Sequence, residues 1–181
     1  MSPNLKLPSA LRADCSRCAA LCCVTPGFYK VQGFGFDKPA HTACAHLQPN
    51  SKCAIHRDRA AHGFVACIGF DCYGAGQRVT REVCRDSTWI VSRENRARVS
   101  AVYASYLVLH RLMATLTIAE QVFARDVRAA LRLKRMQLNR LCRSDDARRG
   151  HLDLSRLSRE THDLVRSCAT TPRDDRPTPH P

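Results

Sequence analysis

The sequence predicts a mainly α-helical protein whose first half is an irregular, cysteine-rich module stabilised by bound metal. Eight of the eleven cysteines lie before residue 73, and seven of the eight glycines lie within residues 14–90. Between residues 91 and 143 glycine is absent, and apolar residues recur with a period near 3.6. We therefore expect a metal-binding module over residues 14–90, followed by about three C-terminal helices within residues 91–169.

The cysteines of the module are the candidate metal ligands. They open with a C-x2-C-x3-C-C run at residues 15–23 and continue up to residue 72. Four thiolates can bind Zn²⁺ or hold an iron–sulfur cluster, and ligands close in sequence lower the entropic cost of closing the site. The predicted ligands are Cys15, Cys18, Cys22, Cys23, Cys44, Cys53, Cys67 and Cys72. The spacing leaves open whether the cofactor is zinc or an iron–sulfur cluster.

The local structure of the first run bears on how these ligands divide. Asp14 is a helix-capping residue type, and one helical turn after it would place Cys15, Cys18 and Cys22 on one face. Cys23 would then point about a quarter-turn away, in a direction that allows a second site. One division joins the first three cysteines with one downstream thiol and Cys23 with the remainder, but the sequence leaves the pairing open.

The cysteines and histidines could also form disulfides, a redox pair or imidazole ligands. No apolar stretch of signal-peptide length opens the chain, which indicates a reducing, cytoplasmic location where structural disulfides are rare. A thioredoxin-like pair at Cys15 and Cys18 needs a preceding strand that the sequence does not signal. His56 is the best imidazole candidate, although a role behind the metal ligands is favoured. The isolated Cys84, Cys142 and Cys168 are interpreted as structural.

The remaining segments are assigned from local patterns. Residues 1–13 form a flexible leader, 28–31 and 64–68 are the most strand-like runs, and Trp89 is expected to anchor packing between the two halves. The capping-box pattern Thr117–Glu120 either starts a second helix or lies within one long helix. Residues 144–150 read as a polar connector, a third helix follows Asp153, and residues 170–181 form a disordered tail.

Charge and hydropathy limit the possible partners. The net charge is +13, with excesses of +5 over residues 1–90 and +8 over residues 91–181. Nucleic-acid binding through the arginine-bearing helices is possible but not favoured, because no basic cluster is interleaved with aromatic residues. The apolar window from Val99 to Ala119 contains His110 and Arg111 at its middle. A central arginine is costly in a bilayer, so we expect a buried helix and no transmembrane segment.

The cysteine pattern resembles two bacterial groups. Cys15-x2-Cys18-x3-Cys22-Cys23, Cys44-x2-Leu47, Cys53-x-Ile55-His56 and Cys67 resemble the putative zinc- or iron-chelating CxxCxxCC cysteine-cluster family. Residues 12–15, 36–40, 63–67 and 70–79 look like the cysteine-rich N-terminal region of certain pentapeptide-repeat proteins. Those relatives continue into tandem repeats, whereas Asp153–Leu157 offers a single repeat frame here. The resemblance implies the same eight cysteines as family positions and no established activity.

These observations predict a non-catalytic metal-binding protein that serves as an adaptor for an unidentified partner protein, or that is a remnant of a pentapeptide-repeat protein. A small cysteine-rich module buries little apolar surface, and metal binding can supply the missing folding free energy. The alternatives are an iron–sulfur or thiol redox enzyme and a nucleic-acid-binding protein.

Overall fold

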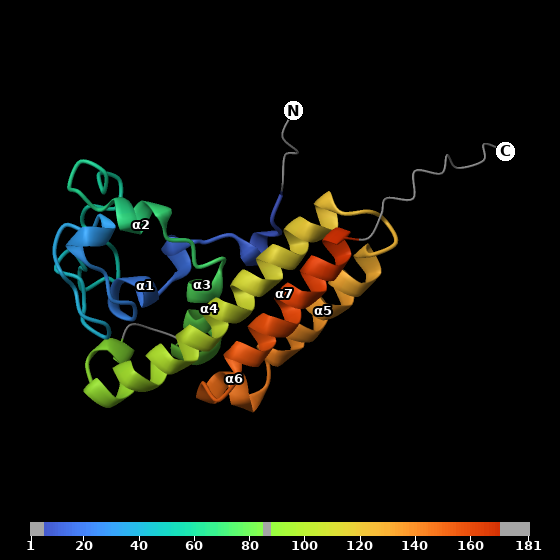
Figure 1. Ribbon diagram of the computed structural model, residues 1–181. Coiled ribbons are helices and arrows are strands. Elements are labelled where there is room, and N and C mark those ends of the chain that lie inside the picture. The colour runs from blue at the N-terminus through green and yellow to red at the C-terminus, as the bar shows by residue number, and fades with distance from the viewer. Residues whose placement is uncertain (1–5, 85–87, 171–181) are drawn as a thin grey trace.

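The computed structural model describes residues 6–84 and 88–170, and within these ranges the protein is mainly helical (Figure 1). Seven α-helices and five short 3-10 or π turns make up the regular structure, and no strand occurs in the described ranges. The irregular cysteine-rich part lies at one end of the long helix α4 (Arg93–Val122), and the other C-terminal helices pack along its opposite half. The expectation of a mainly α protein with an irregular module is therefore confirmed at this level.

The helical half contains four helices over residues 93–170, so the expected number of about three is wrong. After α4 come α5 (Arg128–Leu141), α6 (Asp145–Arg149) and α7 (Leu154–Thr170). The additional helix, α6, lies in the expected polar connector. The Ser144 side chain accepts a hydrogen bond from the Ala147 amide, and Gly150 ends the turn at a φ of 75°. A side-chain cap and a left-handed glycine are sufficient to make one helical turn.

The capping-box pattern at Thr117 does not start a helix. Thr117 lies inside α4, where its hydroxyl donates to the Met113 carbonyl at 2.8 Å. The helix ends five residues later, before Phe123, whose backbone is extended. A threonine hydroxyl can bond back to the preceding turn as well as cap a helix, so the pattern alone could not distinguish the two arrangements.

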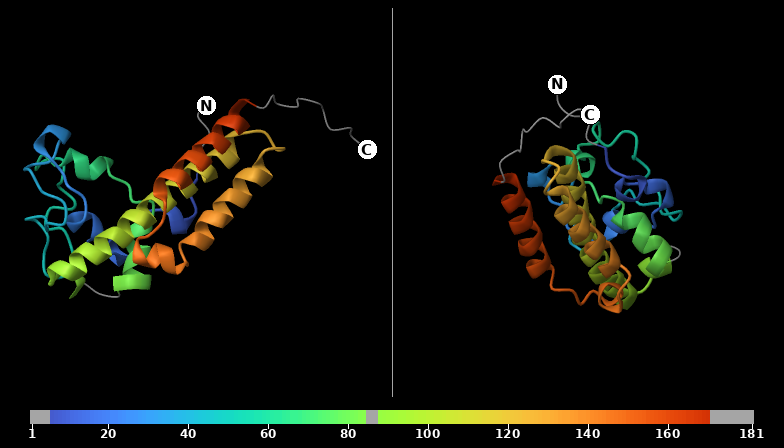
Figure 2. Two further views of the ribbon diagram at one scale, coloured as in Figure 1. Left: turned by 60° about the horizontal axis from the view of Figure 1, so that its bottom comes forward. Right: turned by 90° about the vertical axis from the view of Figure 1, so that its right-hand side faces the viewer.

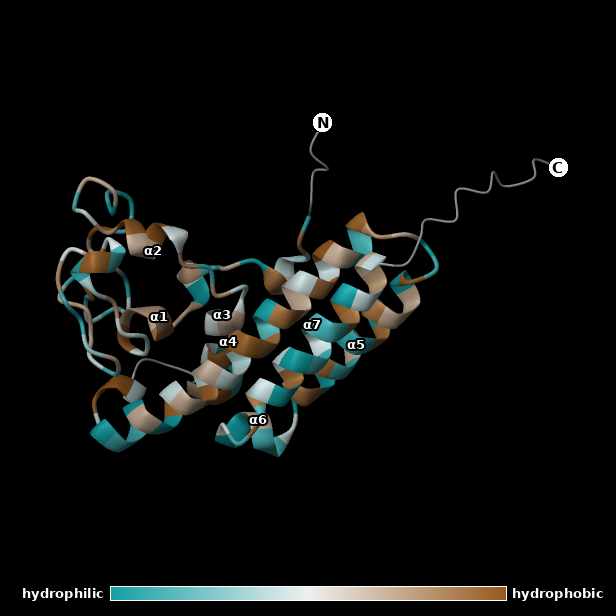
Figure 3. Ribbon diagram, viewed as in Figure 1, coloured by the Kyte–Doolittle hydropathy of each residue, from teal (hydrophilic) through white to brown (hydrophobic). Residues whose placement is uncertain are grey.

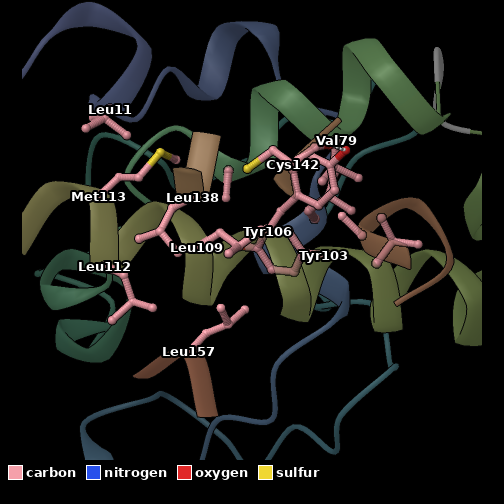
Figure 4. Close-up of a cluster of buried hydrophobic side chains, with 14 of the residues drawn as sticks. Leu11, Val79, Tyr103, Tyr106, Leu109, Leu112, Met113, Leu138, Cys142 and Leu157 are labelled. Atoms are coloured by element: carbon pink, nitrogen blue, oxygen red, sulfur yellow. Dashed lines mark hydrogen bonds between the residues drawn. The ribbon is translucent and has the colours of Figure 1, made fainter. Parts of the chain in front are cut away.

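A hydrophobic core surrounds α4. Tyr103, Tyr106 and Leu109 are at most 1% exposed, and Leu138 of α5 is fully buried (Figure 4). The helices α4, α5 and α7 contact one another and lie side by side in both views of Figure 2. Hydrophilic and hydrophobic residues are interspersed along α5 and α7 (Figure 3), as expected for helices that bury one face.

The length and composition of α4 would also allow it to cross a membrane. Its most apolar window has a mean hydropathy of 1.3, and 61% of that window is buried inside the protein. Because the core helix of a protein has the same composition when other elements cover it, this property is weak evidence for a membrane span. The burial agrees with the expectation that the window is an internal helix.

The cysteine-rich half contains the short helices α1 (Leu21–Val24), α2 (Val65–Gly69) and α3 (Ala75–Val79), joined by turns. The two strand-like runs are not strands. Phe28 makes an isolated bridge with Lys38, and residues 65–69 are helical. Val31 is 94% exposed and Val65 is 60% exposed. Strand propensity expresses packing on a sheet surface, and these side chains have no sheet to pack on.

A second, smaller hydrophobic cluster lies within this half. It is built on the buried rings of Phe28, Phe34 and Phe64. The Phe28 and Phe34 rings stack with centroids 4.9 Å apart, and Phe64 meets Phe34 edge to face at 4.7 Å. The module thus has its own small aromatic centre, separate from the core around α4.

Trp89 joins the two halves, as expected. Its ring is 3% exposed in the core around α4, and its indole N–H donates to the Ala19 carbonyl at 3.1 Å. The expected flexible leader contacts the helices from residue 6 onward, since Lys6 and Gln121 exchange two hydrogen bonds and Leu11 is buried. The disordered tail was predicted to begin at residue 170, but Thr170 is the last residue of α7, and residues 171–181 lie outside the described ranges.

Candidate metal centre

All eight cysteines predicted as ligands line one cavity of about 340 Å³. We call it the eight-cysteine cavity. Its wall also contains the buried Lys38, the rings of the phenylalanine cluster, His46, His56 and Arg59. Cys142 and Cys168 are buried elsewhere in the helical core. The structure therefore brings together eight cysteines that are up to 57 positions apart in sequence. Cys142 and Cys168, which were interpreted as structural, lie outside the cavity.

The first cysteine run reaches the cavity by a route that differs from the expected one. Asp14 does cap a turn, accepting a hydrogen bond from the Ser16 amide, but that turn is a 3-10 helix of three residues, Cys15–Arg17. Ala20 then adopts a left-handed φ of 62°, and α1 starts after it. The prediction that Cys15, Cys18 and Cys22 share one helix face is wrong, because the helix is interrupted. The reversal at Ala20 still turns Cys22 and Cys23 into the same cavity.

Cys72 is held beside Cys18 by the start of α3. An added Cβ on Gly76 would lie 2.8 Å from the Cys18 sulfur and 3.7 Å from the Cys72 sulfur, so both thiols pack over this glycine. The Gln77 side chain accepts from the Asp14 amide and donates to the Arg12 carbonyl. The Gly74–Gln77 stretch thus makes room for two sulfurs and fixes the first cysteine turn.

The other downstream cysteines are placed by backbone hydrogen bonds. The Cys44 amide donates to the Cys23 carbonyl at 2.9 Å. Cys53 pairs with Leu47 in an isolated bridge, and the Leu47 amide donates to the Cys44 carbonyl. Cys67 lies in α2, where the Arg59 guanidinium donates to its carbonyl at 3.2 Å. This network needs no extended secondary structure, which explains why the sequence signals it poorly.

Burial keeps most of these thiols protonated. Desolvation raises the pKa of Cys18 and of Cys67 to about 11 each, and it raises the pKa of Cys15 and Cys44 as well. Deprotonating several such thiols together requires compensating positive charge close to the sulfurs. A bound metal supplies that charge, since metal ligation by cysteine releases the thiol proton.

Cys22 and Cys23 form a coupled pair within the cavity. Their thiols share a hydrogen bond, which raises the pKa of Cys22 well above its usual value and lowers that of Cys23. Desolvation adds to the increase at Cys22, whereas at Cys23 the charges of Lys38 and Arg59 favour the thiolate. Two adjacent thiols of one short helix thus face the same cavity with pKa values shifted in opposite directions.

Lys38 is a buried cationic residue of the cavity wall that the sequence did not predict. It is 1% exposed, and its Nζ donates to the carbonyls of Pro26 at 2.5 Å and Thr42 at 3.0 Å, with longer contacts to two others. Burial lowers the pKa of this amine, and the neighbouring thiols of Cys44, Cys23, Cys22 and Cys67 oppose that effect. A buried lysine beside a cluster of thiols offsets the negative charge of thiolates. A lysine in a Pro-flanked loop gives no sequence signal for this role.

Tyr103 of α4 supplies a polar group with no partner. Its hydroxyl is buried and makes no hydrogen bond within the described residues. Burial raises its pKa well above the usual value, and the nearby thiols of Cys22, Cys72 and Cys18 raise it further. Buried polar atoms are nearly always paired in native proteins, so an unpaired hydroxyl that interacts electrostatically with three of the thiols is an unusual feature of this region.

The two cavity histidines do not act as clear ligands. The His46 ring meets Phe64 edge to face at 5.0 Å. Burial, and then the charge of Arg59, lower the pKa of His56. Within residues 6–84 and 88–170, no three His, Cys, Asp or Glu side chains converge closely enough to hold a single metal ion. The thiols surround a space and do not meet at one point.

Comparison with known proteins gives one relative of unestablished function. The uncharacterized protein YybG of Bacillus subtilis (strain 168) is 32% identical over 171 residues, which cover 90% of this chain. The chain spans 61% of the length of that relative. No family model matches the chain, and no solved structure matches it. The comparisons therefore add no assigned activity, and the site must be interpreted from its geometry and chemistry.

Proposed function

We propose that this chain is a non-catalytic metal-binding protein of the cytoplasm, in which the eight-cysteine cavity holds thiolate-bound metal and the helices form an adaptor surface for a partner protein. The observation that carries the proposal is the gathering of all eight module cysteines around one cavity. None of these eight forms a disulfide. The resemblance to cysteine-cluster families of bacteria agrees with the same assignment.

The donor set favours an iron–sulfur cofactor over a lone zinc ion. Four thiolates around one zinc, with Zn–S bonds of 2.3 Å, place the sulfurs only about 3.8 Å apart. The thiols here line a space of about 340 Å³ and do not converge on a point. An iron–sulfur cluster needs such a space, because its inorganic core lies between the protein thiolates. When bound, this group would supply the positive charge that the buried thiols require.

Two further observations support the fit. The buried Tyr103 hydroxyl has no hydrogen-bond partner among the described residues, and it interacts electrostatically with Cys18, Cys22 and Cys72. The absence of a side chain at Gly76 lets two sulfurs approach the same wall. Hydrogen bonds to cluster or thiolate sulfur tune iron–sulfur centres, and a glycine beside them permits close packing. Both features suit a sulfur-rich cofactor and have no evident use in a purely apolar cavity.

Metal analysis of anaerobically purified protein tests the proposal. We expect iron and sulfide, with visible absorbance, in the wild-type protein and in the Cys168→Ala control, whose cysteine lies in the helical core. The Cys18→Ser, Cys22→Ser double variant should contain less metal than both of these proteins. Tightly bound zinc without colour would keep the metal-binding function and change the cofactor. Metal-free protein that unfolds cooperatively would overturn the proposal and leave the cavity as a small-molecule site, for which its volume is also typical.

The same preparation distinguishes a redox role. If the visible absorbance bleaches on reduction and returns on oxidation at a physiological potential, the second function, electron transfer or redox catalysis, is favoured. The cavity supports this alternative because Lys38 and Arg59 provide cationic charge near the thiols. A centre that cannot be reduced without loss of metal supports the structural role.

A further inference from the structure

The eight-cysteine cavity has two walls that belong to different hydrophobic clusters. Cys18 and Cys72 pack against the core around α4, whereas Cys44 and Cys67 pack against the phenylalanine cluster. Because the two clusters are separate, the pair Cys18 and Cys72 and the pair Cys44 and Cys67 pack against different sets of side chains. This division differs from a single site in which all ligands share one support.

The first wall gathers four thiols. Cys18 and Cys72 lie over Gly76, and the 3-10 turn that begins at Cys15 is tied to α3 through Gln77. Electrostatic contacts join Cys18 to Cys72 and to Cys15. Cys22 interacts with Cys18 and Cys15 besides its neighbour in α1. The unpaired Tyr103 hydroxyl lies near three of these four sulfurs.

The second wall gathers the other four. The backbone bond from Cys44 to Cys23 and the bridge between Leu47 and Cys53 bring three of them together. Cys67 interacts electrostatically with Cys23, Cys44 and Cys53. The buried Lys38 ammonium lies by this wall, with Cys44 and Cys23 as its strongest thiol neighbours.

The walls meet at Cys22 and Cys23. The thiols of this adjacent pair share a hydrogen bond, and Cys15 also interacts with Cys23, so the cavity is continuous. Successive residues of a helix point about 100° apart. One residue of the pair can therefore serve each wall, which explains the use of two adjacent cysteines at this position.

We infer that the eight-cysteine cavity holds two four-thiolate metal centres and that the ligands divide by wall. The first centre is bound by Cys15, Cys18, Cys22 and Cys72, and the second by Cys23, Cys44, Cys53 and Cys67. This inference rests on the proposed metal-binding function and specifies its ligand sets. Tyr103 is a positioning residue for the first centre, and Lys38 offsets charge at the second.

Metal stoichiometry in paired variants tests the division. Cys72→Ser and Cys53→Ser should each retain half of the wild-type metal. The same-wall double variant Cys18→Ser, Cys72→Ser should also retain half, whereas the cross-wall double variant Cys72→Ser, Cys53→Ser should retain none. Complete loss in either single variant, or in the same-wall double variant, would overturn the division. A metal-free wild-type protein would refute the proposed function itself, so the two failures are distinguishable.

Two further measurements test the division if the double cysteine variants fail to fold. During stepwise chelation of the wild-type protein, thiols alkylated at each step and located by mass spectrometry should appear in two groups of four that match the two walls. Tyr103→Phe removes one hydroxyl only. In the Cys53→Ser background it should shift the absorption spectrum of the remaining centre, and in the Cys72→Ser background it should leave that spectrum unchanged. Mixed alkylation groups, or equal spectral shifts, would contradict the assignment.

Discussion

The two halves of this protein are held together by different means. Along α4 the buried side chains are large and numerous, and Leu109, Leu116 and Val102 have no exposed surface. The module contributes Leu21, Val24 and Val79 to the core around α4, but its own cluster has only three buried rings, and its loops are fixed by single backbone hydrogen bonds and by Lys38. Full burial of one large apolar side chain contributes about 1.5–3 kcal/mol. Burial of apolar side chains therefore stabilises the helices strongly and contributes much less to the loops around the eight-cysteine cavity.

This difference gives the proposed metal a definite energetic role. Small domains with few buried residues usually depend on disulfides or metal ions. The module has eight cysteines around a cavity at the place where a core would otherwise lie. Its stability should consequently depend on cofactor occupancy, while that of the helices should depend on side-chain packing.

Metal removal should produce the largest effect and should affect the two halves unequally. Apparent binding energies of structural zinc in small modules are about 10–16 kcal/mol, so chelation under reducing conditions should remove most of the stability of residues 14–72. Amide hydrogen exchange followed by mass spectrometry should then show loss of protection in the module and retained protection in α4 and α5. Equal loss in both halves, or no loss in the module, would contradict the comparison.

A core truncation should have the opposite distribution. Leu109→Ala removes a fully buried side chain of α4 and should lower the unfolding free energy by about 2–5 kcal/mol. Leu133 of α5 is 58% exposed, so Leu133→Ala is the matched control, with an expected change within about 0.5 kcal/mol. Urea denaturation followed by fluorescence of the single tryptophan, Trp89, measures both. Similar losses in the two variants would show that α4 is not the energetic centre.

The same contrast explains what could be predicted from the sequence. Helical periodicity gave the extent of the C-terminal half, because one buried stripe recurs every three to four residues. Cysteine spacing singled out the eight residues that line one cavity, and their role as metal ligands stays a prediction. The count of helices was wrong at Ser144–Gly150, where one hydroxyl and one glycine made a turn into a helix. Capping interactions of that kind can form a helical turn in a segment whose polar composition predicts a loop.

The sequence did not predict the roles of Lys38, Tyr103 and Gly76, and the reason is the same for all three. Lys38, Tyr103 and Gly76 act through contacts with thiols that are distant in sequence. Their roles depend on burial and on which sulfurs they meet, and neither property leaves a periodic pattern. The interrupted helix at Ala20 has the same origin, since a non-glycine residue in the left-handed region is favoured there only by the surrounding contacts.

The smallest predicted effect concerns the joint between the halves, where His110 of α4 meets the module. Its Nδ1 lies 2.6 Å from the Tyr73 carbonyl, which fixes the proton on that nitrogen, and its buried Nε2 has no hydrogen-bond partner within residues 6–84 and 88–170. Burial lowers the pKa of His110 to about 4, and Arg78 lowers it as well, whereas the bond to Tyr73 and the charge of Glu82 oppose the change.

A folded-state pKa below the unfolded value of about 6.5 means that the unfolded chain takes up the proton first as pH falls. Stability contributed by neutral His110 is thus complete above about pH 6.5 and is lost towards pH 4, by about 2 kcal/mol between pH 7 and pH 5. His110→Asn can still donate to Tyr73 but does not titrate. Denaturation of metal-loaded protein at both pH values should show a smaller loss in the variant by about that amount. Equal pH dependence in both proteins would show that His110 is protonated without cost and that the joint tolerates a buried charge.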